Sequence, residues 1–489
     1  MSHLLLAKPV APLLYFDLEA PDVGLGYLAT ALKRAGHSVR IVDSLQRGLD
    51  QDGLLAAVTR ERPDAVGFKV YTKDLASVRE SMRRIRALSP AMVTLAGGPF
   101  PSGAGADTLR YLPDCDYAFQ GEAEEGLPML AEALCRREGA PGPAELAKIP
   151  GLIWRGPTGA VANDRSCPDD LDALGYPDWE ALQVQDYMDD RSPALVMRGN
   201  YLPVLTGRGC PYRCTYCAGP LVTGQATRRH SLEYVLGWVE FFRDRFGARH
   251  FSITDDNFLQ DRPFVMAFCQ ALLDRKLDIR WECGSNGIRL NQVDEELLRL
   301  MERSGCYLVS VGVESGSPRI LAAMKRHLDL DEIRRTTALI RRVTRFRIIG
   351  FFILGYPEET LEEIHETVRL ALELPLDRAN LFIYTPHPGT EAFERYVDPR
   401  IFETGKSEDF RYDSVSGVHP TIPSWRLRLI RTVALLRFHL RPRIVLSMLG
   451  ELDSLAKLMR VVEFFRFAFF HLPRFRPRNA SRGRLPEGG

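Results

Sequence analysis

Three cysteines stand within eight residues of each other, Cys210, Cys214 and Cys217, in "TGRGCPYRCTYCAGP". Three thiolates on one short loop can ligate three corners of an iron–sulfur cubane and leave its fourth iron without a protein ligand. A structural zinc site takes four ligands, and an electron-transfer cluster is usually held by four cysteines. No nearby cysteine supplies a fourth ligand, and the nearest downstream histidine is His230. The spacing favours a cluster with one open iron that a substrate or cofactor can coordinate, with a zinc knuckle as the alternative.

The remaining six cysteines stand singly, and we expect each to be a small buried hydrophobe: Cys115, Cys135, Cys167, Cys269, Cys283 and Cys306. The 489 residues carry a formal charge of +1 with 45% hydrophobic and 26% charged residues, which is ordinary for a globular protein of about three domains. This charge does not indicate a nucleic-acid partner. Neither a signal peptide nor a membrane-spanning run is evident, so a cytoplasmic location is expected.

Two series of alternating strand-like and helix-like stretches must position these cysteines. The first covers residues 1–138, with buried strands such as "SVRIVDS", "DAVGFKVYT" and "MVTLAGGP". This alternation predicts a doubly wound, Rossmann-like parallel sheet with ligands at the carboxyl ends of its strands. A linker rich in Pro, Gly and Asp follows over 139–198.

The second series covers residues 199–398 and contains six strand-like runs, from "YLPVLTGRG" to "NLFIYTPHPG". Six parallel strands with helices between them predict a partial (β/α)6 barrel of the TIM type, with its functional loops at the carboxyl ends of the strands. Residues 399–489 have a helical pattern. The expected fold class is therefore α/β, with a helical C-terminal region.

The cysteine motif with Tyr216 before its last cysteine resembles the signature of the radical S-adenosylmethionine (radical SAM) superfamily. The resemblance implies a [4Fe-4S] cluster on Cys210, Cys214 and Cys217, and it continues through the barrel series. "ITDDNF" stands where the family binds the amino group of SAM, with Asp255 and Asp256 in place of the usual Gly-Gly-Glu. Glu314 in "GVESGS" matches the carboxylate that holds the ribose hydroxyls, because a carboxylate accepts hydrogen bonds from both.

Two further matches concern the rest of the SAM molecule. "GFFILGYPEET", with Ile353, resembles the stretch that backs the adenine, and "YTPHPGT" resembles the turn after the sixth strand. Arg289 follows the third strand and is suited to pair with the carboxylate of SAM.

The first domain resembles the cobalamin-binding domain of one radical SAM subfamily. Gly97 and Gly98 in "GGPFPS" and Gly121 in "FQGEAEEGL" match its glycine turns, which allow the backbone to approach a flat macrocycle. Thr72 and Glu122 are then suited to hydrogen-bond the amide arms of cobalamin. A dinucleotide site is the rival interpretation, but no G-x-G-x-x-G follows the first strand. The D-x-H-x-x-G motif is absent, which implies cobalamin without a lower histidine ligand.

The resemblance implies an enzyme that cleaves SAM to a 5′-deoxyadenosyl radical and transfers a methyl group from methylcobalamin to an unactivated carbon or phosphorus. Its cofactors would be the cluster, SAM and cobalamin. One alternative keeps these cofactors in an oxidative cyclase or rearrangement enzyme, such as the tetrapyrrole cyclases. A non-enzymatic iron–sulfur or cobalamin sensor is a second alternative.

The expected partners are a small-molecule or lipid-like substrate and an external electron donor of the flavodoxin or ferredoxin type, with no nucleic acid. From Met459 the tail alternates phenylalanines with arginines, so it is suited to peripheral contact with an anionic membrane. The alternative for the tail is a core-packing helix followed by a disordered basic end.

Overall fold

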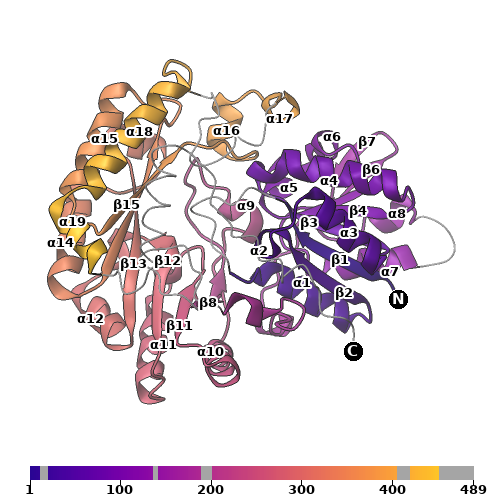
Figure 1. Cartoon of the computed structure of the whole chain (residues 1–489), viewed down its shortest axis with the longest axis horizontal. Helices are drawn as coiled ribbons and strands as arrows, with labels where there is room; N and C mark the ends of the chain where they lie inside the picture. The colour runs from indigo at the N-terminus through magenta and orange to yellow at the C-terminus, as the bar shows by residue number, and fades with distance from the viewer. Residues whose placement is uncertain (11–19, 136–140, 189–200, 405–418, 451–489) are drawn as a thin grey trace.

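The computed structural model describes residues 1–10, 20–135, 141–188, 201–404 and 419–450. Two α/β domains lie side by side, the first in indigo and violet and the second in pink to orange (Figure 1). The fold class predicted from the sequence, including the helical C-terminal region, is confirmed.

The first domain is built on a seven-stranded sheet in the order β2-β1-β3-β4-β5-β6-β7. Its strands are β1 (His3–Lys8), β2 (Ser38–Asp43), β3 (Ala65–Lys69), β4 (Val93–Gly97), β5 (Tyr117–Phe119), β6 (Leu152–Gly156) and β7 (Gly159–Ala162). The first five strands pair in parallel, and the helices between them cover the sheet. These helices are α1 (Val23–Arg34), α2 (Ser44–Arg47), α3 (Gln51–Glu61), α4 (Leu75–Leu88), α5 (Pro99–Ala104), α6 (Thr108–Tyr111) and α7 (Gly126–Cys135).

Part of the range predicted as a linker forms the β6–β7 hairpin. It follows the short helix α8 (Pro143–Leu146), and β6 pairs antiparallel with β5 through Ala118 and Ile153. Gly151 makes this return possible: its φ is +68°, and a Cβ atom there would lie 2.6 Å from the carbonyl oxygen of Gln120. Part of the range 139–198 therefore extends the first sheet, because β5 has a free edge that the hairpin covers.

The second domain contains a six-stranded parallel sheet in the order β15-β14-β13-β12-β11-β8. Its strands are β8 (Tyr201–Val204), β11 (His250–Ile253), β12 (Arg280–Ile288), β13 (Cys306–Glu314), β14 (Arg347–Leu354) and β15 (Arg378–Ile383). Strands β8 and β15 are its edges, so the barrel is partial. Every residue of the central strand β13 is buried, as expected for a parallel strand covered on both faces.

The helices of the second domain begin at residues whose side chains cap them. Asp261, Asp294 and Asp329 each accept a backbone N–H of the first turn, and Thr360 and Glu363 form a capping box. The long helices are α10 (Leu232–Phe246), α11 (Arg262–Asp274), α12 (Glu295–Arg303), α14 (Leu330–Val343) and α15 (Leu361–Glu373).

The two domains contact each other directly. Thr72, three residues after β3, hydrogen-bonds His387, which follows β15, over 3.1 Å. Gly103 in α5 lies so close to the Pro388 turn that a Cβ atom would meet its carbonyl oxygen at 2.0 Å. Helices α16 (Glu391–Tyr396) and α17 (Ile401–Thr404) reach over to the first domain (Figure 1), where Phe402 stacks edge-on against Phe100. The carboxyl ends of both sheets thus face one interface.

Helices α18 (Ser424–His439) and α19 (Pro442–Leu449) lie on the outer side of the second domain, next to α15 (Figure 1). Arg431 of α18 is buried and donates a hydrogen bond to the carbonyl of Leu381 in β15. The basic, aromatic tail from Met459 lies outside the described residues. In the part of the chain that the structure describes, none of the helices is long and apolar enough to span a bilayer.

Candidate active site

The three cysteines lie on the loop between β9 (Gly207–Arg208) and β10 (Arg228–Arg229), a small antiparallel pair after β8. The N–H of Cys210 donates to the carbonyl of Gly224, which closes the loop on itself. Thr215 donates to the carbonyl of Met324 and accepts from the N–H of Ala392. The loop is therefore held from both the fourth and the sixth strand–helix connections of the barrel.

Burial raises the pKa of the Cys217 thiol to about 12, and it also raises the pKa of Cys210. Both thiols are destabilised as anions by their neighbouring cysteines as well, so the three side chains lie close to one another. A coordinating metal deprotonates a thiol outright, which reverses this balance. Among the described residues, no three His, Cys, Asp or Glu side chains converge on a point that one metal ion could take. This donor set fits a cluster, in which each cysteine ligates a different iron.

Asp255 and Asp256 anchor this loop to the barrel. Asp255 is buried and accepts hydrogen bonds from the backbone N–H of Thr206 (2.7 Å) and from the guanidinium of Arg229 (2.6 Å). Asp256 accepts from the N–H of Gly209 (3.2 Å) and from the hydroxyl of Thr223 (2.6 Å). The two carboxylates predicted to bind the amino group of SAM are thus engaged with the chain on either side of the cysteines.

Glu314 lies at the end of β13 next to the cysteine loop, in a left-handed backbone conformation with φ of +68°. Its carboxylate is 3.3 Å from the guanidinium of Arg326. Burial raises the pKa of Glu314, while Arg326 and a hydrogen bond from Tyr216 act to lower it. Left-handed residues other than glycine cost about 1–3 kcal/mol and cluster at functional sites. The predicted ribose ligand and the aromatic residue of the cysteine motif are therefore in contact.

Arg326 is a functional candidate that the sequence motifs did not identify. It is buried between two left-handed residues, Lys325 (φ 53°) and His327 (φ 48°). Its guanidinium donates to the carbonyl of Gly312 over 2.7 Å and hydrogen-bonds the thiol of Cys214. The left-handed φ angles of its two neighbours distinguish Arg326 from other arginines, and φ angles cannot be read from the sequence.

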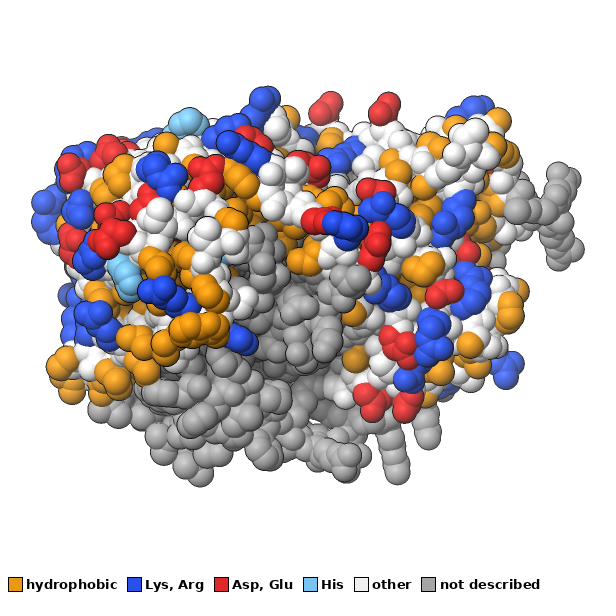
Figure 2. All heavy atoms as spheres, turned by 90° about the horizontal axis from the view of Figure 1, so that it is seen from above, with side chains coloured by type: hydrophobic (Ala, Val, Ile, Leu, Met, Phe, Trp, Pro, Cys, Tyr) orange, Lys and Arg blue, Asp and Glu red, His pale blue; other side chains and the backbone are white. Residues whose placement is uncertain are grey.

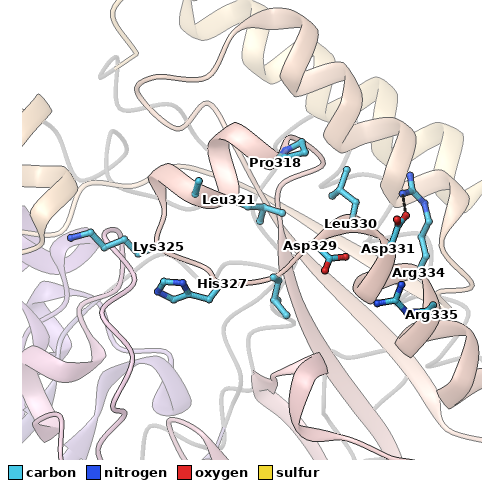
Figure 3. Close-up of a pocket in the computed structure, with 11 residues that line it drawn as sticks. Pro318, Leu321, Lys325, His327, Asp329, Leu330, Asp331, Arg334 and Arg335 are labelled. Carbon is cyan, nitrogen blue, oxygen red and sulfur yellow. Dashed lines mark hydrogen bonds and ion pairs between the residues drawn. The ribbon is translucent and has the colours of Figure 1, made fainter.

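The same segment borders a surface pocket of about 690 Å³ between α13 (Pro318–Ala323) and the start of α14. Lys325 and His327 lie at one end of this pocket, and Arg334 and Arg335 lie at the other (Figure 3). Arg326 does not line it, because its guanidinium is directed to Gly312 and Glu314.

Several buried polar atoms beside the cysteine loop have no hydrogen-bond partner among the described residues. They are Oδ1 of Asn257, Oε1 of Gln292, and Nε of Arg289 and of Arg326. The guanidinium of Arg289 stacks over the ring of Tyr212 at 3.5 Å and donates to the carbonyl of Arg326. Buried polar groups normally have hydrogen-bond partners, so these unpaired atoms indicate a binding site for a polar ligand. SAM fits them, because its amino group donates while its carboxylate accepts.

Ile353 of β14 packs in a small apolar cluster beside the site, with Tyr216, Ile320, Tyr356 and Tyr384. The predicted adenine-backing stretch therefore provides a hydrophobic wall that also touches the cysteine motif. Tyr384 OH has no hydrogen-bond partner among the described residues either.

The glycine turns of the first domain lie at the carboxyl ends of its parallel strands. Gly98 has φ of +93°, and a Cβ atom there would lie 3.3 Å from the N of Val70. A Cβ atom on Gly97 would meet nothing within 4 Å, so the turn has open space above it. Gly121, with φ of +74°, donates its N–H to the hydroxyl of Ser102. A flat macrocycle fits such a half-buried turn without side chains.

Thr72 and Glu122 have partners within the protein. Thr72 contacts His387, as described above, and burial lowers the pKa of that histidine to about 4. The carboxylate of Glu122 forms buried ion pairs with Arg208 (2.9 Å) and Arg228. In this structure both side chains therefore join the two domains, and the predicted contacts to the amide arms of cobalamin would have to compete with these bonds.

His230 is unsuited as a fourth cluster ligand, because its two ring nitrogens contact Asp172 (2.8 Å) and the hydroxyl of Tyr27 (3.0 Å). Of the single cysteines, Cys115, Cys269, Cys283 and Cys306 are buried as predicted. Cys135 is half-buried, and the prediction for Cys167 was wrong. Cys167 is exposed because it lies in an irregular segment that crosses the surface between the domains.

A thiolate loop at the mouth of a partial parallel barrel, facing the glycine turns of a doubly wound domain, defines an α/β protein with two adjoining cofactor sites. Residues 11–131 match the B12 binding domain, and residues 204–371 match the radical SAM superfamily. The chain therefore joins a B12 binding domain to a radical SAM domain, as in the enzyme family that the sequence predicted. The cofactor set of this family, a [4Fe-4S] cluster, SAM and cobalamin, is also the predicted one.

Individual relatives cover most of the chain. An uncharacterized methyltransferase of Pyrococcus horikoshii is 27% identical over 88% of this chain and 90% of its own. Cytidylyl-2-hydroxyethylphosphonate methyltransferase of Streptomyces wedmorensis is 28% identical over 81% and 83%. The radical SAM methyltransferase TsrM of Kitasatospora setae, solved with cobalamin and a [4Fe-4S] cluster, covers 82% of this chain and 80% of its own at 22% identity. Its TM-score of 0.65 shows that the two share a fold.

Proposed function

We propose that this protein is a cobalamin-dependent radical SAM methyltransferase that methylates an unactivated carbon or phosphorus centre. When bound, the reduced cluster supplies the electron that cleaves SAM, and the corrinoid supplies the methyl group. The methyltransferase relatives support methyl transfer over the oxidative alternative. The substrate is a small or lipid-like molecule, and the electron donor is an external protein of the flavodoxin or ferredoxin type.

One observation carries the proposal: ion pairs connect the turn after β5 of the first domain to β9, the strand that leads into the cysteines. Glu122 and Glu124 of this turn pair with Arg208, which stands two residues before Cys210. A reaction between groups bound at the two cofactor sites requires a fixed distance between these sites, because correct placement of reacting groups supplies much of the rate. A sensor that only bound the cofactors would not need this connection.

The proposed roles of the side chains follow from their positions. Cys210, Cys214 and Cys217 hold the cluster, Glu314 the ribose hydroxyls, and Ile353 the adenine. Arg289 and Arg326 present unpaired N–H groups to the carboxylate of SAM, and Asn257 presents an acceptor to its amino group. Gly97, Gly98 and Gly121 form the floor under the corrinoid. The domain limits 1–138, 139–198, 199–398 and 399–489 remain proposals, with the β6–β7 hairpin moved to the first unit.

The test is anaerobic reconstitution with iron, sulfide and cobalamin, followed by reduction in the presence of SAM that carries a deuterated methyl group. Methyl transfer predicts S-adenosylhomocysteine together with labelled methylcobalamin, before any substrate is known. The oxidative alternative predicts 5′-deoxyadenosine without either product, and this result would overturn the proposal. Cys214→Ala should abolish 5′-deoxyadenosine formation while leaving cobalamin uptake intact. Cys135→Ala, outside the loop, is the matched control and should retain both.

A further inference from the structure

Helix α18 presents an apolar stripe to solvent on the side opposite to its buried face. Trp425, Leu429 and Val433 are 61%, 54% and 43% exposed, and they stand at successive intervals of four residues. At 100° per residue these three positions fall within about 80° of the helix circumference. Leu427, Ala434 and Phe438 of the opposite side are buried against the barrel. A helix at the surface of a globular domain normally has one apolar face, and α18 has two.

The stripe continues past the end of α18. Leu440 is 58% exposed, and Leu446 on α19 is 68% exposed. Five of the large hydrophobic side chains that the described residues expose therefore lie between positions 425 and 446. Figure 2 shows hydrophobic side chains gathered among Lys and Arg on the side of the molecule where Figure 1 places α18 and α19. Single exposed apolar residues are ordinary, whereas a contiguous patch marks an interaction site.

The segment that carries this stripe has charged side chains of one sign only. Residues 419–450 contain six arginines and no aspartate or glutamate. Arg426, Arg428 and Arg437 are exposed and form no hydrogen bond or ion pair with a described residue. By helix geometry Arg426 and Arg437 border one edge of the stripe and Arg428 borders the other. Arg443 is close to Asp377 (3.6 Å), so it is partly neutralised.

We propose that the exposed face of α18 and α19 docks on an anionic lipid surface. Apolar side chains that include a tryptophan, with arginines on both sides, are the composition of a helix that lies in the membrane interface. A protein partner would require complementary acids and a shaped surface, whereas lipid headgroups supply diffuse negative charge to every arginine at once. A free interfacial helix turns its polar face to water, whereas in α18 the face opposite to the stripe packs on the barrel.

The docking surface is rigidly connected to the site. Leu427 of α18 packs on Gly355, the residue that follows β14, and a Cβ atom on Gly355 would lie 2.9 Å from the Leu427 side chain. Arg431 holds β15 from the same helix. Docking through α18 would therefore fix the orientation of the barrel relative to the membrane. This inference does not depend on methyl transfer, because no cofactor residue is part of the surface.

The test uses the full-length protein and flotation with vesicles of phosphatidylcholine, with or without phosphatidylserine. Binding is expected only with phosphatidylserine, and it should weaken as salt is raised. Leu429→Glu combined with Val433→Glu should reduce the bound fraction at least tenfold. Leu88→Glu combined with Met129→Glu, at exposed apolar positions of the first domain, is the control and should bind as the wild type does. Replacing Arg426, Arg428 or Arg437 by Gln should weaken binding about fivefold for each arginine.

Trp425 gives a second readout within the same experiment. The other four tryptophans, Trp154, Trp179, Trp238 and Trp281, are buried, so solvent-sensitive emission comes from Trp425. Its emission should shift to the blue and become shielded from iodide on anionic vesicles. The proposal is overturned if the glutamate variant binds vesicles as well as the wild type, or if the emission of Trp425 does not change. It is also overturned if this variant dissociates a dimer in the absence of lipid, since the face would then join two copies.

Discussion

The carboxylate of Glu122 lies 2.9 Å from the guanidinium of Arg208, and both side chains are buried. Glu122 belongs to the glycine-rich turn of the cobalamin-binding domain, and Arg208 immediately precedes the cysteine loop of the radical SAM domain. Arg228 and Glu124 complete a network of two acids and two arginines. A buried ion-pair network therefore joins the glycine-rich turn of the first domain to the start of the cysteine loop.

Glu122→Gln tests the strength of this contact. The change leaves two buried arginines with one remaining acid, and removing one partner of a buried pair costs about 3–5 kcal/mol. We expect the free energy of unfolding, measured in urea, to fall by about 3 kcal/mol, because the amide keeps one acceptor. Glu125→Gln, an exposed residue of the same turn, should change it little. An unchanged value for Glu122→Gln would show that the pair does not stabilise the domain contact.

Glu314→Gln tests the proposed ribose contact. The variant loses a charged acceptor, and hydrogen bonds to charged groups contribute about 1.5–3 kcal/mol, so the Kd for SAM should rise at least tenfold. Equilibrium binding to the reconstituted protein measures this, with Glu362→Gln on the exposed side of α15 as the control. A SAM analogue without the ribose 2′-hydroxyl should bind the wild type and the variant with more similar affinity. If the Kd for the analogue differs between wild type and variant as much as the Kd for SAM does, Glu314 does not contact the 2′-hydroxyl.

The neighbouring glycines Gly97 and Gly98 are expected to respond differently to alanine. Gly97 has open space above it, so Gly97→Ala should leave unfolding unchanged within about 0.5 kcal/mol while reducing cobalamin affinity at least tenfold. Gly98→Ala forces a side chain into φ of +93° and should destabilise the domain by about 1–3 kcal/mol. Absorbance titration with cobalamin and urea unfolding separate the two effects. If Gly97→Ala bound cobalamin as tightly as the wild type does, the corrinoid would not lie over this turn.

Glu282 predicts a pH dependence of stability. It is fully buried in β12, on the opposite face from Trp281 and Cys283, and burial raises its pKa from 4.5 to about 7. The folded state therefore holds this proton more tightly than the unfolded chain does. Its contribution is complete below pH 4.5 and is lost as pH rises to about 7, a change of about 3 kcal/mol.

Glu282→Gln removes this titration, so the difference in unfolding free energy between variant and wild type should move in favour of the variant from pH 5 to pH 7 by about 2–3 kcal/mol. Glu296→Gln, an exposed acid in a surface ion pair, should show a difference that is flat with pH. A flat difference for Glu282→Gln as well would mean that the carboxylate finds a stabilising partner when charged.

Local patterns were sufficient for the parallel strands and for the cysteines, but they did not predict the β6–β7 hairpin. Buried runs such as "DAVGFKVYT" and "YLVSVGVESG" became β3 and β13 because parallel strands need continuous apolar sequence. The partners of Asp255 and Glu122 were not predictable in this way. Arg228 is 106 residues from Glu122, and Arg229 is 26 residues from Asp255. An acidic motif shows that carboxylates lie near a site, but it does not show which of these carboxylates form ion pairs with arginines of the same chain.

By itself, the sequence determined the family resemblance, the parallel strands of the two sheets and the three thiols, because strand periodicity and ligand spacing are properties of neighbouring residues. Only the tertiary structure decided which acids remain available. It engaged Asp255, Asp256 and Glu122 with the chain, and it brought Arg326 and Asn257 to the cysteine loop with unpaired polar atoms. The physical reason is that a buried charge must find a partner, and the nearest one in space comes from another strand connection or another domain.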